Sequence, residues 1–156
     1  MKKSLNFLCN LGKVNKNKQK MELEEKKSVK SFAIEYLQKW DIKYEIIKSD
    51  YLVFKYQGGE FFIHTFEDDP NVLHLIMPSI YIINNDRIEV IEAMLNIIGG
   101  KKLIKAFLHE DDVCLCVDML MDPSSNIDFF EEMIKRCFSC LFDSQREFST
   151  YLLKNN

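Results

Sequence analysis

The segment around Gln57-Gly58-Gly59 constrains the fold most, because it predicts a β-hairpin. Runs of β-branched and aromatic residues, Tyr51–Tyr56 and Glu60–Phe66, stand on either side of it. Glycine adopts a positive φ without steric cost, and a glycine pair between two strands is typical of a tight turn. A two-residue turn at Gly58-Gly59 predicts that Tyr56 pairs with Phe61, Phe54 with Ile63, and Leu52 with Thr65.

Both faces of this hairpin are apolar. Directly paired residues point to the same face, so the six paired residues form one face of the predicted sheet. The opposite face carries Tyr51, Val53, Lys55, Phe62, His64 and Phe66. A face in contact with water is expected to be mainly polar, and this one is not. Both faces therefore need a cover, from helices of this chain or from another molecule.

Three helices and four further strands are predicted around the hairpin. The helices span about Glu22 to Trp40, Asp86 to Ile98 and Asp122 to Leu153. The strands are Lys43–Lys48, Val72–Met77, Leu103–Leu108 and Val113–Met119. This order, α-β-β-β-β-α-β-β-α, predicts an α+β fold in which helices flank an antiparallel sheet.

Two details of these elements are predicted from glycine and proline. In the second helix, the apolar residues at helical spacing are Ile88, Ile91, Leu95 and Ile98. Gly99-Gly100 is expected to end that helix, because glycine tolerates the left-handed conformation of a helix cap. Pro78 lacks an N–H group and is expected to confine the strand before it to an edge or an end of the sheet.

The last two strands form a second hairpin with the same property. One predicted face holds Ile104, Ala106, Leu108, Val113, Leu115 and Val117. The other holds Leu103, Phe107, Cys114 and Cys116 beside Lys105, His109, Asp112 and Asp118. Apolar second faces in both hairpins favour a homodimer or a protein partner as the cover. The alternative, in which the three helices cover parts of both faces, stays open.

Aromatic side chains supply the candidate partner-binding residues on this second face. Large aromatic residues dominate binding hot spots, which makes Tyr51, Phe62 and Phe66 the expected anchors. The full predicted set is Tyr51, Val53, Phe62, His64, Phe66 and Phe107.

The charge is unevenly distributed along the chain. Residues 1–20 carry six Lys and no acidic residue, so the rest of the chain has 15 basic and 24 acidic residues and a net charge of −9. An acidic body repels phosphate backbones, and nucleic-acid binding is not expected. We predict a basic leader at 1–21 and one domain at 22–153. No apolar stretch approaches the roughly 18 residues of a membrane span. The five cysteines, with no export signal, predict a cytoplasmic protein with free thiols.

The spacing of the cysteine and histidine residues raises the question of metal binding. Cys114-x-Cys116 and Cys137-x-x-Cys140 could together hold zinc, or the second pair could be redox-active. His64 and His74 are expected on neighbouring strands, where Glu67 or Asp69 could add a ligand. Core packing and ordinary strand pairing fit these spacings better, so we predict no metal and no cofactor. No phosphate-binding loop or nucleophile motif occurs, and we predict no catalytic residues and no enzymatic activity.

The element order is similar to that of the YbjN family, which shares the fold of type III secretion chaperones. The resemblance covers about residues 22–153 and includes the stretch Lys102–Leu108, the acidic turn, Val113–Met119 and a closing helix rich in Phe, Met and Ile. It implies a small, non-enzymatic interaction module that is often dimeric. We therefore expect a chaperone-like or regulatory protein that binds a protein or peptide, and the alternative is a regulatory domain that senses a small ligand.

Overall fold

The computed structural model describes residues 28–122 and 124–155, whose elements follow the predicted order. The helices are α2 (Val29–Lys39), α3 (Arg87–Gly100) and α4 (Ile127–Asn155). The strands are β1 (Tyr44–Ile47), β2 (Tyr51–Tyr56), β3 (Gly59–His64), β4 (Val72–Ile82), β5 (Ile104–His109) and β6 (Asp112–Leu120). The predicted leader at 1–21 and the predicted helical residues 22–27 lie outside the described residues.

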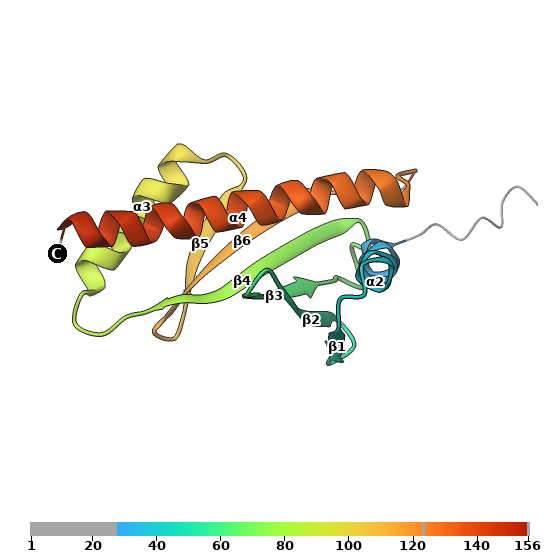
Figure 1. Ribbon diagram of the computed structural model, residues 1–156, viewed down its shortest axis with the longest axis horizontal. Helices are drawn as coiled ribbons and strands as arrows, with labels where there is room; N and C mark the ends of the chain where they lie inside the picture. The colour runs from blue at the N-terminus through green and yellow to red at the C-terminus, as the bar shows by residue number, and fades with distance from the viewer. Residues whose placement is uncertain (1–27, 123, 156) are drawn as a thin grey trace, which may run out of the picture.

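The six strands form one antiparallel sheet in the order β1-β2-β3-β4-β6-β5 (Figure 1). The two predicted hairpins are β2–β3 and β5–β6. They are joined by β4, which pairs with β3 on one side and with β6 on the other. The α+β class and the antiparallel sheet with flanking helices are therefore confirmed.

All three described helices contribute to one hydrophobic core on a single face of the sheet. Figure 1 shows α3 and α4 above the sheet, with α2 beside the first turns of α4. On the strands, this core contains alternate residues: Leu52, Phe54, Phe61, Ile63, Leu73, Leu75, Met77, Ile104, Val113, Leu115 and Val117. Cys114 and Cys116 point the other way and are not part of it. Within the described residues, the helices therefore pack on one face of the sheet and not on both.

The register of the first hairpin differs from the prediction by two residues. Phe54 pairs with Phe61 and Leu52 pairs with Ile63, because the turn residues are Gln57 and Gly58. Both have a positive φ, 49° and 83°, as a tight hairpin turn requires. A slip of two residues returns each side chain to the same face, so the predicted faces remain correct.

The glycine pair does not stop α3 as predicted. The helix includes Gly99 and Gly100 and ends where the backbone becomes extended at Lys101. Among the described glycines, a positive φ occurs at Gly58 alone. The buried side of α3 consists of Val90, Ala93, Met94 and Ile97. The stripe that keeps the helical period, Ile88, Ile91, Leu95 and Ile98, is instead solvent-exposed, by 40–73%.

Pro78 lies inside a central strand, which contradicts the prediction of an edge or an end. The strand β4 continues to Ile82, and its pairing with β6 is interrupted between Met77 and Tyr81. Ser79, within this bulge, has a positive φ of 47°. The pairing of β4 with β3 ends at Ile76. The missing N–H group of Pro78 therefore falls where neither neighbouring strand needs it.

Alanine substitutions at Gly58 and Gly99 are expected to change the stability of the protein in opposite directions. We expect Gly58→Ala to destabilise the protein by about 1 kcal/mol, because alanine is strained at a positive φ. Gly99→Ala is expected to stabilise it by about 0.5 kcal/mol, because a Cβ there meets nothing within 4 Å and alanine favours helix. Urea unfolding of both variants measures the two changes. A loss of stability in both would contradict the helical assignment of Gly99.

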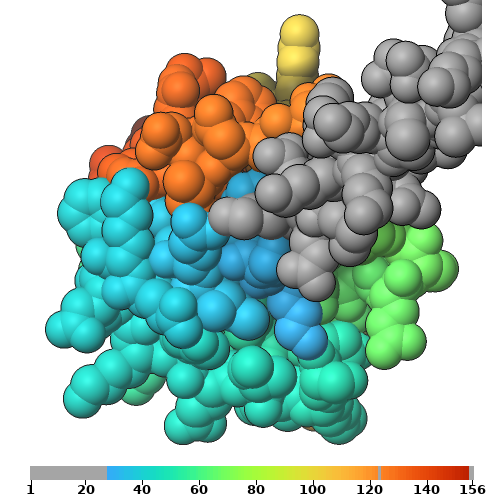
Figure 2. Space-filling model, turned by 90° about the vertical axis from the view of Figure 1, so that its right-hand side faces the viewer, coloured from blue at the N-terminus to red at the C-terminus, as the bar shows by residue number. Residues whose placement is uncertain are grey.

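Helix α2 contacts the start of α4 through ring packing and through charge. Phe32 stacks on Phe130 with ring centroids 5.8 Å apart. Glu131 accepts hydrogen bonds from Lys135 at 2.5 Å and from Lys39 at 2.7 Å. Figure 2 views this end of the molecule and shows α2, in blue, packed below the start of α4, in orange. None of the helices in the described ranges combines the length and apolar character that a membrane crossing needs.

We expect this contact to make stability fall in acid. The hydrogen bonds from Lys135 and then Lys39 lower the pKa of Glu131 from 4.5 to about 2. A lowered folded-state pKa stabilises the fold above pH 4.5, and this contribution is lost as the pH falls toward 2. Glu131→Gln is therefore expected to be less stable at neutral pH and to lose less stability across that window.

Urea unfolding at neutral pH and at about pH 3 measures this difference, since pH 3 lies inside the window of the shifted carboxyl group. Glu132→Gln is the matched control, because its ion pair with Arg136 is exposed on both sides. Parallel pH profiles for Glu131→Gln and the unmodified protein would refute the assignment.

Candidate functional site

The face of the sheet opposite the helices is the candidate functional site, and we call it the open face. No described helix packs on it. Its residues come from β2, β3, β4, β5 and β6: Tyr51, Val53, Phe62, His64, His74, Ile76, Phe107, Cys114, Cys116 and Asp118. Most of these side chains are half-buried, and Cys114 and Cys116 are buried. The open face is therefore an ordered surface of aromatic, aliphatic and imidazole groups.

One row of paired residues crosses the open face from Tyr51 through His64 and His74 to Asp118. The rings of Tyr51 and His64 stack with centroids 4.3 Å apart and an interplanar angle of 2°. Phe66 lies against His64, with centroids 4.2 Å apart. The Nε2 atom of His64 is 3.6 Å from Oδ2 of Asp50. These contacts hold three aromatic rings in fixed positions on the surface.

A second row beside it is apolar and lies in a hollow. Val53 pairs with Phe62, Phe62 with Ile76, and Ile76 with Cys116. The hollow has a volume of about 600 Å³, and its walls include Tyr51, Phe62, Ile76 and Phe107. It is large enough for the side chains of a bound segment, and its apolar lining residues stand beside the charged or polar residues Lys48, Glu60, His109 and Asp112.

The structure brings together most of the predicted partner-binding residues. The hollow is lined by Tyr51, Val53, Phe62, His64 and Phe107. Phe66 follows the end of β3 and reaches the same face through its contacts with the rings of His64 and His74. The set predicted from strand alternation thus occupies one continuous surface.

The polar end of the first row is a chain of three charged or ionisable groups. Nδ1 of His74 is hydrogen-bonded to Oδ1 of Asp118, and Nζ of Lys105 donates a hydrogen bond to Oδ2 of the same carboxylate. Burial raises the pKa of Asp118, but the hydrogen bonds from Lys105 and His74 outweigh it and hold that pKa below its ordinary value. Asp118 is therefore a carboxylate that uses both oxygens as acceptors.

Comparison with known proteins identifies the fold. No family model and no curated protein matches the sequence. Among solved structures, YbjN from E. coli, described as a proposed transcription regulator, matches with a TM-score of 0.54. The match covers 78% of this chain and 87% of that one, at 12% sequence identity. The chain has a YbjN-like fold. At this identity the likeness establishes the arrangement of helices and strands, and the site must be argued from its own residues.

The YbjN-like fold separates the two cysteine pairs that could have shared a zinc ion. Cys114 and Cys116 lie on the open face, whereas Cys137 is buried in the helix-covered core and Cys140 follows it on α4. Burial raises the pKa of Cys137 to about 12, the opposite of what a reactive thiol needs. Neither the four-cysteine zinc site nor a redox pair on α4 is supported.

The pairing of the two histidines was predicted correctly. The acidic residues suggested as further ligands do not lie beside them. His64 pairs directly with His74. Glu67 and Asp69 are exposed and belong to no group of clustered metal-ligating side chains in the described ranges. Asp118 takes their place beside His74, because β6 is the neighbour of β4. No local sequence pattern predicts the pairing of His74 with Asp118, because the two residues are 44 positions apart.

Proposed function

We propose that this protein is a non-enzymatic interaction module that binds a protein or peptide segment on the open face and works as a homodimer. The observation that carries the proposal is the apolar, aromatic-rich character of that face, which none of the described helices covers. Tyr51, Phe62 and Phe66 are the anchors of the surface, because large, pre-positioned aromatic rings contribute most to binding. The description of YbjN as a proposed transcription regulator supports a regulatory form of this role.

The charge of the chain favours a basic, amphipathic client. Residues 21–156 carry a net charge of −9, which attracts basic segments and repels acidic ones. The hollow supplies apolar contacts for every second residue of an extended segment, or for one face of a helix. The charge attraction and the apolar contacts both favour binding of a segment that alternates apolar and basic residues.

A second copy of the chain is the proposed cover for the exposed stripe of α3: Ile88, Ile91, Leu95 and Ile98. Their spacings of three, four and three residues read the same in both directions. A two-fold axis through the middle of the stripe therefore places Ile88 opposite Ile98 and Ile91 opposite Leu95 in an antiparallel helix pair. Such self-complementarity is what a two-fold dimer interface requires. Dimerisation through α3 leaves the open face free for a client.

Binding of a small ligand is the second candidate. The hollow of about 600 Å³ lies within the size range of small-molecule sites. A ligand that binds the folded protein raises its melting temperature in a concentration-dependent way, with no protein partner present. A screen of small molecules by thermal shift separates this role from client binding.

Peptide binding tests the main proposal. We expect fluorescence anisotropy with a panel of labelled basic amphipathic peptides to detect binding, and acidic peptides of the same apolar pattern to bind at least about tenfold more weakly. Phe62→Ser is expected to abolish binding. Leu153→Ser is the control, because this residue is 81% exposed on α4 and lies away from the open face. Equal affinity in the two variants, or no binding by any basic peptide, would refute the proposal.

A further inference from the structure

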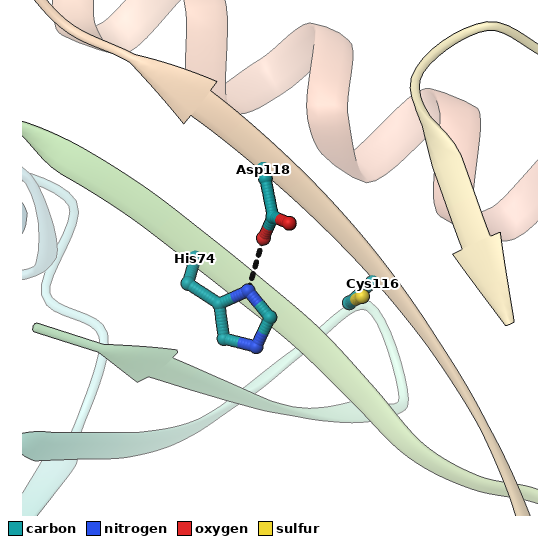
Figure 3. Close-up of side chains that lie close together, drawn as sticks. All are labelled: His74, Cys116 and Asp118. Atoms are coloured by element: carbon teal, nitrogen blue, oxygen red, sulfur yellow. Dashed lines mark hydrogen bonds and ion pairs between the residues drawn. The ribbon is translucent and has the colours of Figure 1, made fainter. Parts of the chain in front are cut away.

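Three potential metal ligands of different chemistry converge at the polar end of the open face. His74 projects from β4, and Cys116 and Asp118 project from the facing strand β6 (Figure 3). Asp118 pairs directly with His74, and Cys116 is two residues away on the same strand, so the pleat directs all three to one side. A ring nitrogen of His74, the Sγ atom of Cys116 and a carboxylate oxygen of Asp118 lie within 4.8 Å of one another.

We propose that these three residues bind a single divalent metal ion, with Zn²⁺ as the preferred ion. Imidazole nitrogen, thiolate sulfur and carboxylate oxygen are the three ligand types that zinc takes in proteins, at about 2.0–2.3 Å. Donor atoms less than 5 Å apart reach such an ion by small side-chain rotations. Three protein ligands leave one tetrahedral position for water or for an atom of a bound molecule. The thiolate makes Mg²⁺ and Ca²⁺ poor occupants, because these ions take oxygen ligands.

Lys105 is compatible with the ion because it uses the other oxygen of Asp118. Oδ1 of Asp118 faces His74, and Oδ2 accepts from Lys105. An ion between His74 and Asp118 replaces the first of these bonds and leaves the second in place. Lys105 then orients the carboxylate, as outer hydrogen-bond partners of metal ligands do. Its side chain is 64% exposed, so its ammonium group can also move toward solvent.

The site is distinct from the other titratable groups of the open face. The rings of His64 and His74 are 6.0 Å apart, and His64 is engaged by Tyr51 and Asp50 instead. Cys114 lies on the same strand and face as Cys116 but pairs with Phe107, away from His74. Burial raises the pKa of the Cys116 thiol to about 11, so the metal-free protein carries a thiol here, and metal binding deprotonates it and releases its proton to solvent. The proposal does not depend on client binding, and its test needs no client.

Cobalt titration of the reduced, metal-free full-length chain tests the site, because Co²⁺ reports its ligands optically. We expect a thiolate-to-cobalt charge-transfer band in the near ultraviolet, visible bands of a four-coordinate ion, and their loss when one equivalent of Zn²⁺ is added. Cys116→Ser is expected to remove the charge-transfer band. Cys114→Ser, the matched control two residues away on the same face, is expected to retain it.

His74→Ala keeps the test decisive if Cys116→Ser does not fold. Loss of an outer hydrogen-bond partner of a metal ligand weakens metal binding by roughly 10–100-fold. Loss of the ligand itself removes more, so we expect His74→Ala to weaken Co²⁺ binding by more than that range. Zn²⁺ is expected to raise the melting temperature of the unmodified protein and not that of His74→Ala. No charge-transfer band in the folded protein, or a band lost in Cys114→Ser but kept in Cys116→Ser, would overturn the proposal.

Discussion

Phe61→Ala is expected to destabilise the protein by about 3–5 kcal/mol, the range for a fully buried phenylalanine. Phe61 is 0% exposed, and its ring packs 4.9 Å from that of Phe138 and 5.6 Å from that of Phe142. It therefore joins the middle of the sheet to the middle of α4. Truncation leaves a cavity that β2 cannot close, because Phe54, the partner of Phe61, is paired on its other side with Tyr44 of β1. Chemical denaturation measures the loss.

Phe62→Ala is the matched control, since it removes the same side chain from the next position of the same strand. Phe62 lies on the open face and is only half-buried, so we expect it to cost about 1 kcal/mol. The two substitutions should also differ in binding: Phe62→Ala weakens capture of a basic amphipathic peptide, and Phe61→Ala does not while the chain is folded. Equal losses of stability would mean that both faces of the sheet are covered.

Leu95→Lys is expected to separate the homodimer into monomers that are folded normally. Leu95 is 63% exposed on α3, so lysine at this position is tolerated in a single chain. In the proposed dimer, the charge is buried near Ile91 of the second copy. We expect the dissociation constant to rise by more than about 100-fold, because an unpaired charge buried in an interface costs several kcal/mol. Sedimentation velocity across a range of concentrations measures this change.

The control for that substitution is Leu120→Lys. Leu120 is 77% exposed and ends β6 opposite Val72, at the end of the sheet away from α3. It matches Leu95 in residue type and exposure but lies outside the proposed interface. Dissociation of both variants to the same degree would argue for a general effect of charge rather than for an interface on α3.

The faces of the strands could be predicted from the sequence because strand alternation has a period of two. The turn of the first hairpin lies at Gln57-Gly58 rather than at Gly58-Gly59, yet the error of two residues left Phe62 on the open face. A slip of one residue would have exchanged the faces. Alternation also placed Phe107 and Cys116 correctly in the second hairpin.

The orientation of α3 could not be predicted, because this helix is apolar on nearly every side. Val90 and Ile97 are buried, whereas Ile91 and Ile98, one position further along, are exposed. Hydrophobic periodicity cannot select a core face when both sides carry aliphatic residues. Packing against α4 and β5 decides it, and this packing is a property of the assembled fold. The exposed stripe therefore emerged only from the structure.

The pairing of β4 with β6 could not be predicted from the sequence either, and the polar end of the site depends on this pairing. A strand pair separated by α3 and β5 leaves no turn signal in the sequence. His74, Asp118 and Lys105 meet only because β6 lies between β4 and β5. Sequence reasoning placed His64 beside His74, but it could not place Asp118 or Lys105 beside them.

The mass of the full-length protein in solution tests the central claim, that its uncovered apolar surfaces serve association, most directly. Light scattering coupled to gel filtration is expected to give twice the 18.5 kDa mass of the chain, and to return a single-chain mass for Leu95→Lys. A monomer for the unmodified protein at every concentration, up to the highest that stays in solution, would contradict the claim.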